Sequence, residues 1–272
     1  MFRLFSTLII CAVVALPNCV HAEEGELGNL FGMVVVIDPG HGGQDPGAIG
    51  TFPGPQKSRV GVVENEHVYD VAIRLARIVR VHGGAAVFTI RDSNQLQSAL
   101  PPGTPIPEDR NEMYAHTTRM VRAKSAGLQP RLNYANNALR RYPKHRVVFI
   151  SLHFDVVGAG LEGVRIITPS GDPDLPFAEF LADHFRRGQR IRKNVKGEEH
   201  YPVAASGTRG IPNLYILSSR NHIAQRVLIE LGNFNNPDDN WRLRDYRVRE
   251  NYAQYIVRAL TDLNRLALAL VR

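Results

Sequence analysis

The stretch MVVVIDPGHGGQDPGA, residues 33–48, joins an apolar run to a glycine-rich loop. A continuous apolar run such as 33–37 is typical of a strand that is buried on both faces of a parallel sheet. In α/β folds, functional residues gather at the carboxyl ends of such strands. The glycines around His41 let the backbone turn sharply there. We therefore expect a buried strand that presents His41 at its end, although His41 taken alone is also compatible with an ordinary turn histidine.

Strand and helix patterns alternate along the rest of the chain. Alternation of this kind is typical of helices that cover both faces of a mostly parallel sheet. We therefore predict an α/β fold, a single-domain three-layer sandwich with a mostly parallel central sheet of about six strands and helices on both faces. Residues 93–127 and 193–213 show no periodic pattern, and long irregular loops often border a functional site. Besides 33–37, strands are expected at 85–90, 146–152, 163–168, 214–217 and 226–231, and helices at 64–81, 130–142, 175–192 and 245–269.

The first 22 residues have the pattern of a secretory signal peptide. Arg3 precedes an apolar run that is too short for a confident membrane span, and Val20-His21-Ala22 forms a small-residue cleavage pattern. An uncleaved anchor, or a lipid on Cys19, is the alternative. We predict a catalytic domain at residues 23–272, periplasmic or secreted, with no stable membrane insertion after cleavage. Both cysteines lie in residues 1–22, so the exported chain would contain no disulfide.

Composition and loop chemistry restrict the classes of partner. The net charge of +7 favours anionic partners. Export argues against nucleic acid, and no dense basic stretch is interleaved with aromatic residues. The loop after residue 37 lacks both the G-x-G-x-x-G pattern and the Lys-Ser/Thr pair of phosphate-binding loops. Neither nucleic acid nor a nucleotide cofactor is therefore expected.

A second histidine repeats the arrangement of His41. The expected strand 146–152 runs directly into His153. Two imidazoles and a carboxylate with one open position are the usual protein ligands of catalytic zinc. Glu64, where a loop meets the first helix, is the candidate carboxylate, and Glu66 and His67 are its rivals. A glutamate at a helix start is also explained by a favourable interaction with the helix dipole.

Glu230 lies within the apolar strand VLIELGN, residues 227–233. A carboxylate in such a strand is costly to bury unless it is paired or used. Burial would raise its pKa towards neutrality, which suits a general base. The alternative is a structural carboxylate whose hydrogen bonds are satisfied. Because acidic residues are rarely buried, we favour a functional role for Glu230.

Taken together, these motifs resemble the zinc-dependent N-acetylmuramoyl-L-alanine amidases of the amidase-3 type. The resemblance runs in order from Val34 to the C-terminal helix. It departs at Phe154-Asp155, where a small residue and asparagine are common, and in a longer stretch between Arg91 and Arg131. The matching positions are Asp38 to Ala48; Gly61, Glu64 and Ala72; Thr89, Arg91 and Asp92; Arg131, Ala135 and Asn136; Ser151 and His153; and Glu230, Gly232, Asn233, Asn236 and Asp239.

The resemblance implies specific roles and a substrate. His41, Glu64 and His153 would bind Zn²⁺, and Glu230 would be the catalytic residue. The expected reaction is hydrolysis of the amide between N-acetylmuramic acid and L-alanine of the peptidoglycan stem peptide, in wall remodelling or daughter-cell separation. The alternatives are a zinc peptidase acting within the stem peptide and a non-catalytic peptidoglycan-binding protein. Some relatives need a protein activator to displace an inhibitory helix, and the helix expected at 175–192 is the candidate here, although core packing also explains its apolar stripe.

Overall fold

The central sheet has six strands in the order β4-β1-β7-β10-β8-β9. The computed structural model describes residues 29–53, 59–94, 96–122, 127–172 and 175–270, so the predicted signal peptide and both cysteines lie outside the described residues. Every pair of neighbouring strands is parallel except β8 with β10. The strands are β1 (Met33–Pro39), β4 (Ala85–Phe88), β7 (Arg146–Asp155), β8 (Arg165–Thr168), β9 (Val203–Ala205) and β10 (Gln225–Asn233).

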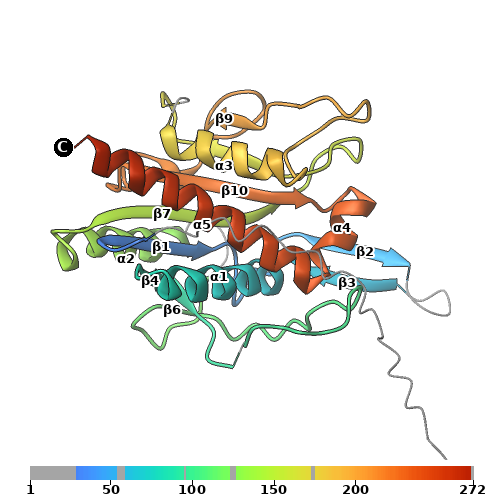
Figure 1. The fold of residues 1–272 in the computed structure, drawn as a ribbon. Helices are drawn as coiled ribbons and strands as arrows, with labels where there is room; N and C mark the ends of the chain where they lie inside the picture. The colour runs from blue at the N-terminus through green and yellow to red at the C-terminus, as the bar shows by residue number, and fades with distance from the viewer. Residues whose placement is uncertain (1–28, 54–58, 95, 123–126, 173–174, 271–272) are drawn as a thin grey trace, which may run out of the picture.

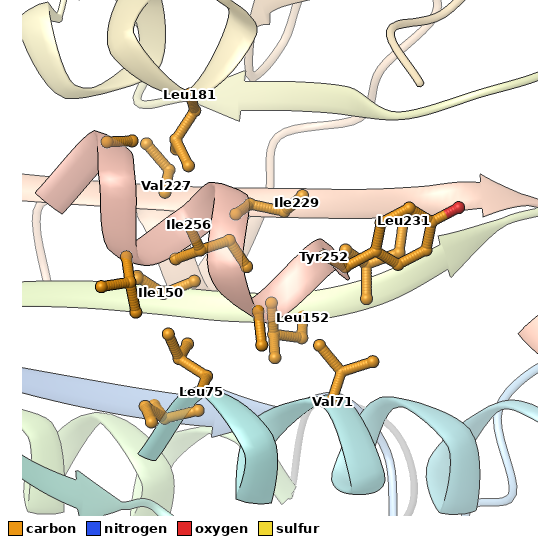
Figure 2. Close-up of a cluster of buried hydrophobic side chains, with 14 of the residues drawn as sticks. Val71, Leu75, Ile150, Leu152, Leu181, Val227, Ile229, Leu231, Tyr252 and Ile256 are labelled. Carbon is orange, nitrogen blue, oxygen red and sulfur yellow. The ribbon is translucent and has the colours of Figure 1, made fainter. Parts of the chain in front are cut away.

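Helices cover both faces of this sheet, as Figure 1 shows. One face carries α1 (Glu64–Val81), α3 (Pro176–Arg187) and α5 (Tyr246–Ala269), and the other carries α2 (Leu128–Arg141). Alternate residues of each strand point to opposite faces. The larger core lies on the three-helix face, where side chains of α1, α3 and α5 meet those of β7 and β10 (Figure 2). The predicted three-layer α/β architecture is therefore confirmed. Figure 2 labels Val71, Leu75, Ile150, Leu152, Leu181, Val227, Ile229, Leu231, Tyr252 and Ile256.

The strand predicted at 214–217 is wrong. Tyr215–Leu217 forms the short 3-10 helix η3, and the sixth strand is instead β9, which lies inside the stretch expected to be irregular. A four-residue apolar run does not by itself distinguish a strand from a helical turn. The three residues of β9 are too few to show a period. Whether each of these two segments forms a strand depends on pairing with strands that are distant in the sequence.

The helix expected at 175–192 ends earlier, at Arg187. Gln189 adopts a left-handed backbone with φ of 55°, a conformation that commonly ends helices. The chain then runs extended, and Ile191 bridges Val164. The apolar stripe of α3 packs into the larger core, which is the packing explanation given above.

Smaller elements complete the fold. The hairpin of β2 (Ile49–Pro53) and β3 (Arg59–Val63) leads directly into α1, β5 (Ile90–Arg91) pairs with β6 (Met113–Tyr114), and α4 (Pro237–Leu243) precedes α5. Apart from Ile90 of β5, which falls at the end of the strand predicted at 85–90, the sequence patterns indicated none of them. Across the described ranges, no helix combines the length and apolar character needed to cross a bilayer.

Candidate active site

Strand register brings the candidate residues to one end of the sheet. The carboxyl end of β1 lies beside that of β7, with Pro39 opposite Leu152. Glu230 of β10 lies opposite His153 of β7. Directly opposed residues project from the same face of a sheet. His153 and Glu230 therefore share the α2 face, next to the loop that carries His41.

His41, Glu64 and His153 form a compact group. Oε1 of Glu64 lies 3.1 Å from Nε2 of His41 and 3.1 Å from Nδ1 of His153, and the two ring nitrogens are 3.2 Å apart. Zinc bonds of about 2.0–2.1 Å in a tetrahedral arrangement place ligand atoms roughly 3.3 Å from one another. Both the donor set and its spacing therefore fit a metal ion. Metal binding itself stays a prediction.

Backbone donors fix the carboxylate of Glu64. Glu64 is the first residue of α1 and follows β3 without a loop. The amide of Phe154 donates to Oε1 at 2.9 Å, and the amide of Ala48 donates to Oε2 at 2.8 Å. Burial opposes the charged form, but His41 and His153 hold the pKa of Glu64 well below its ordinary value. The group thus presents an ionised carboxylate to any cation bound there.

The His41 loop is held in an unusual conformation. His41 has a φ of 64°, a left-handed conformation that non-glycine residues seldom adopt and that often marks a functional site. A Cβ at Gly40 would lie 2.4 Å from the His153 ring, and one at Gly47 would lie 2.6 Å from Oε2 of Glu64. Both positions thus require glycine because the loop packs directly on the site. Asp45 faces Nδ1 of His41 at 3.1 Å, which leaves Nε2 directed at the group.

Arg131 and Asp38 support this loop from below, a role that the sequence motifs did not reveal. Both side chains are buried, and Nη1 of Arg131 donates to Asp38 at 2.9 Å and to the carbonyl of Pro39 at 2.6 Å. Nη2 of Arg131 donates to the carbonyl of His41. The hydroxyls of Ser151 and Thr89 donate to the same aspartate. Because the buried Arg131–Asp38 pair makes all of these hydrogen bonds, it holds the backbone at His41 in a fixed position.

The rivals of Glu64 lie elsewhere. His67 is fully buried, its Nδ1 lies 2.7 Å from the carbonyl of Val63, and the amide of Ile106 donates to its Nε2. With one nitrogen donating and the other accepting, the ring is neutral, and burial lowers its pKa to about 3. His67 therefore ties the 93–127 segment to α1 and does not face the group around Glu64.

Glu66 belongs to a second cluster of buried carboxylates, with Asp92 and Glu112. The side-chain amide of Asn65 donates to both glutamates, at 3.1 and 2.7 Å. Burial, followed by the charges of Glu112, Asp109 and Asp92, raises the pKa of Glu66 to about 8. Glu112 also accepts from the amide of Gly43 at 2.6 Å, so this cluster supports the His41 loop from the side.

Glu230 is the remaining predicted residue. Its side chain is partly exposed, yet Oε2 is shielded from solvent and accepts no hydrogen bond from the described residues. Burial, followed by the charges of Asp155 and Glu64, raises the pKa of Glu230 well above its ordinary value. A buried carboxylate oxygen without a donor is rare in folded proteins. The oxygen is therefore free to accept a hydrogen bond or a proton from a bound molecule.

A cavity of about 310 Å³ opens beside the histidines. Its walls combine polar residues of the His41 loop with apolar side chains from the start of α2, from β10 and from the segment between β9 and β10. The residues of α3 do not line it, so within the described chain this helix does not cover the group. The lining includes His41, Asp45, Arg131, His153, Leu214 and Tyr215.

The fold and this site together define an α/β protein with a His-Glu-His group that could hold a metal ion, beside a glutamate whose Oε2 is shielded and accepts no hydrogen bond from the described residues. Residues 35–262 match the family model of the N-acetylmuramoyl-L-alanine amidases known as amidase-3. The chain therefore belongs to this amidase family. The expected fold, family and amidase activity are thereby confirmed.

Known relatives agree over nearly the full length. The N-acetylmuramoyl-L-alanine amidase Rv3717 of Mycobacterium tuberculosis is 23% identical over 267 residues, which cover 91% of this chain and 93% of the relative. The crystal structure of the amidase Ami1 from Mycobacterium smegmatis has a TM-score of 0.53 at 20% identity, covering 86% of this chain and 98% of that one. The amidase AmiC2 of Nostoc punctiforme has a TM-score of 0.54 at 21% identity, covering 86% and 97%. At these identities the solved structures support the fold alone.

Proposed function

We propose that the protein is a zinc-dependent hydrolase that cleaves the amide between N-acetylmuramic acid and L-alanine in peptidoglycan. The carrying observation is the unpartnered, shielded Oε2 of Glu230 beside the His41–Glu64–His153 group. Family membership supports the substrate and the bond. The predicted export to the periplasm or the exterior is consistent with a wall substrate and remains part of this proposal.

The residues divide the chemistry between them. His41, Glu64 and His153 would hold the zinc ion, which supplies Lewis acidity to the scissile carbonyl and to the attacking water. Glu230 accepts the proton of that water and returns it to the leaving amine of L-alanine. Its raised pKa makes the carboxylate a stronger base than an exposed glutamate. Asp38 and Arg131 keep the His41 loop in place during the reaction.

The test combines product analysis with one substitution. Purified protein should release stem peptide with an intact N-terminal L-alanine from sacculi, as read by mass spectrometry. A chelator should stop the release, and added Zn²⁺ should restore it. In Glu230→Gln, turnover should fall by about 10²- to 10⁴-fold with unchanged circular dichroism and zinc content. Glu179→Gln, at an exposed position on α3, is the matched control.

Other outcomes would favour other functions. Cuts inside the stem peptide would indicate a zinc peptidase with the same metal group. Binding to sacculi without any release, and without bound zinc, would indicate a peptidoglycan-binding protein. Full turnover in Glu230→Gln would remove Glu230 from the mechanism.

A further inference from the structure

Arg165 extends the row of functional residues across the sheet. Glu230 lies opposite His153 on one side and opposite Arg165 of β8 on the other. The three side chains therefore project from the same face, on adjacent strands. Neighbouring strands are about 4.8 Å apart, so the Cα atoms of His153 and Arg165 are separated by roughly 10 Å. Sequence reasoning did not identify Arg165.

The guanidinium of Arg165 has no partner among the described residues. The side chain is only 9% exposed, and its Nε is shielded without a hydrogen bond. No carboxylate lies within 4.0 Å of it in the described chain, and no acceptor bonds to it. Its two terminal nitrogens also make no hydrogen bond to the described residues and are not among the shielded atoms, so they remain available to a ligand. An anion bound there would supply the acceptor that the protein does not.

A second buried arginine reinforces the positive charge. Arg192 is fully buried, its Nη1 donates to Asp155 at 2.7 Å, and its Nη2 has no described partner. Burial and the charge of Arg192 lower the pKa of Arg165, whereas Asp155 and Glu230 act in the opposite direction. Asp155 stands at the position where the sequence departs from the usual family pattern. The hydrogen bond from Arg192 to Asp155 holds Arg192 close to Arg165.

The two exposed arginines Arg209 and Arg220 are arranged differently. Arg209 stacks on the ring of Tyr201 at 4.1 Å, and Arg220 lies 5.6 Å from the ring of Tyr215. Exposed arginines are well solvated and need no ligand to satisfy them. Shielded donors without a hydrogen bond are therefore found not on these two arginines but on Nε of Arg165 and Nη2 of Arg192, and, further along the described chain, on Arg146 and Arg249.

We propose that Arg165, held in place with Arg192, binds a carboxylate of the stem peptide during amide hydrolysis. This inference rests on the proposed amidase function. A guanidinium presents a planar set of donors that matches a carboxylate. On the substrate, the peptide side of the scissile amide carries free carboxylates, at the second residue and at the third, diamino-acid residue. Arg165 would thus set a preference for the free acid over the amidated form.

The test uses synthetic N-acetylmuramoyl tripeptides that differ in one group. One carries both carboxylates, one has the second-residue carboxylate as the amide, and one has the third-residue carboxylate as the amide. The unmodified protein should cleave one amidated peptide with about 10- to 100-fold lower kcat/KM, the range expected for losing a hydrogen bond to a charged group. Which of the two suffers identifies the carboxylate bound.

Arg165→Gln supplies the second measurement. Its kcat/KM should fall by a similar factor on the free acid and by less than about threefold on the disfavoured amide. Arg165→Lys should retain part of the preference, since it keeps the charge. Arg187→Gln, at an exposed position on α3, should change neither value. Zinc content and circular dichroism should match those of the unmodified protein.

Two results would overturn the inference. Equal cleavage of all three peptides by the unmodified protein would show that no carboxylate is recognised. An equal loss on every peptide in Arg165→Gln, with zinc content retained, would place Arg165 at the reacting centre instead. If the unmodified protein cleaved none of the peptides, the proposed function would fail, and this inference with it.

Discussion

Replacing Glu66 by glutamine should change how the stability of the protein depends on pH. Burial raises the pKa of Glu66 from an ordinary 4.5 to about 8. Its proton therefore stabilises the folded state fully below pH 4.5, and this stabilisation is lost as the pH rises through 8. In Glu66→Gln the side chain is always neutral and keeps Oε1, which accepts from Asn65 and from the amide of Asp109.

The expected change in the free energy of unfolding follows from the size of the pKa shift of Glu66. A pKa difference of about 3.5 units corresponds to about 3–5 kcal/mol once residual solvent screening is allowed for. We expect the two proteins to have the same free energy of unfolding near pH 4.5. At pH 9, Glu66→Gln should be more stable by about 3–5 kcal/mol. Groups far from this cluster titrate alike in both proteins, so the difference reports the titration of Glu66 together with its coupled neighbours Glu112, Asp109 and Asp92.

Urea unfolding followed by circular dichroism, at intervals from pH 4.5 to 9 with a chelator present, measures this difference. The chelator removes any contribution from bound metal. Glu198→Gln, an exposed glutamate, is the control and should give a curve parallel to that of the unmodified protein. Parallel curves for Glu66→Gln as well would refute the reasoning, because they would show that Glu66 is ionised at neutral pH in the folded protein.

Two further substitutions test the support of the site. Arg131→Met leaves Asp38 buried without its cation and leaves the carbonyl of His41 without its donor. The free energy of unfolding, measured with urea, should therefore fall by about 3–5 kcal/mol, and muropeptide turnover should fall sharply. Full activity in Arg131→Met would contradict the supporting role of Arg131. Gly47→Ala places a methyl group 2.6 Å from Glu64, whereas Gly171→Ala has a similar positive φ and open space. Zinc content measured by metal analysis should fall in Gly47→Ala alone, and an equal fall in both would attribute the effect to backbone strain.

Periodic elements with a buried face were predictable from the sequence. Helix α1 begins and ends at the predicted residues, and β1, β7 and β10 were found because their apolar runs face two layers. The hairpin of β2 and β3 and the short β9 were not, because short or two-stranded pairings leave little pattern. The prediction of a strand at 214–217 was wrong for the same reason.

The site residues that lie in recognisable sequence motifs were predictable. The structure brings together His41, Glu64 and His153, which the resemblance implied as metal ligands, and places Glu230 opposite His153, which the sequence did not predict. Glu64 could not be separated from Glu66 and His67 by sequence, since three residues of one helical turn differ only in direction. The structure separates them. Arg165 was missed because its importance lies in pairing with Glu230 across strands, and sequence separation hides such pairs.

The alternation of β10 has a consequence for substitutions far from the site. Val227, Ile229 and Leu231 enter the larger core, while Glu230 points to the opposite face between them. A slip of one residue would send Glu230 into that core and expose the three aliphatic side chains, each at about 1.5–3 kcal/mol. The aliphatic residues therefore hold the base in line with His153 and Arg165. A core substitution that loosens this strand should reduce turnover before it unfolds the protein.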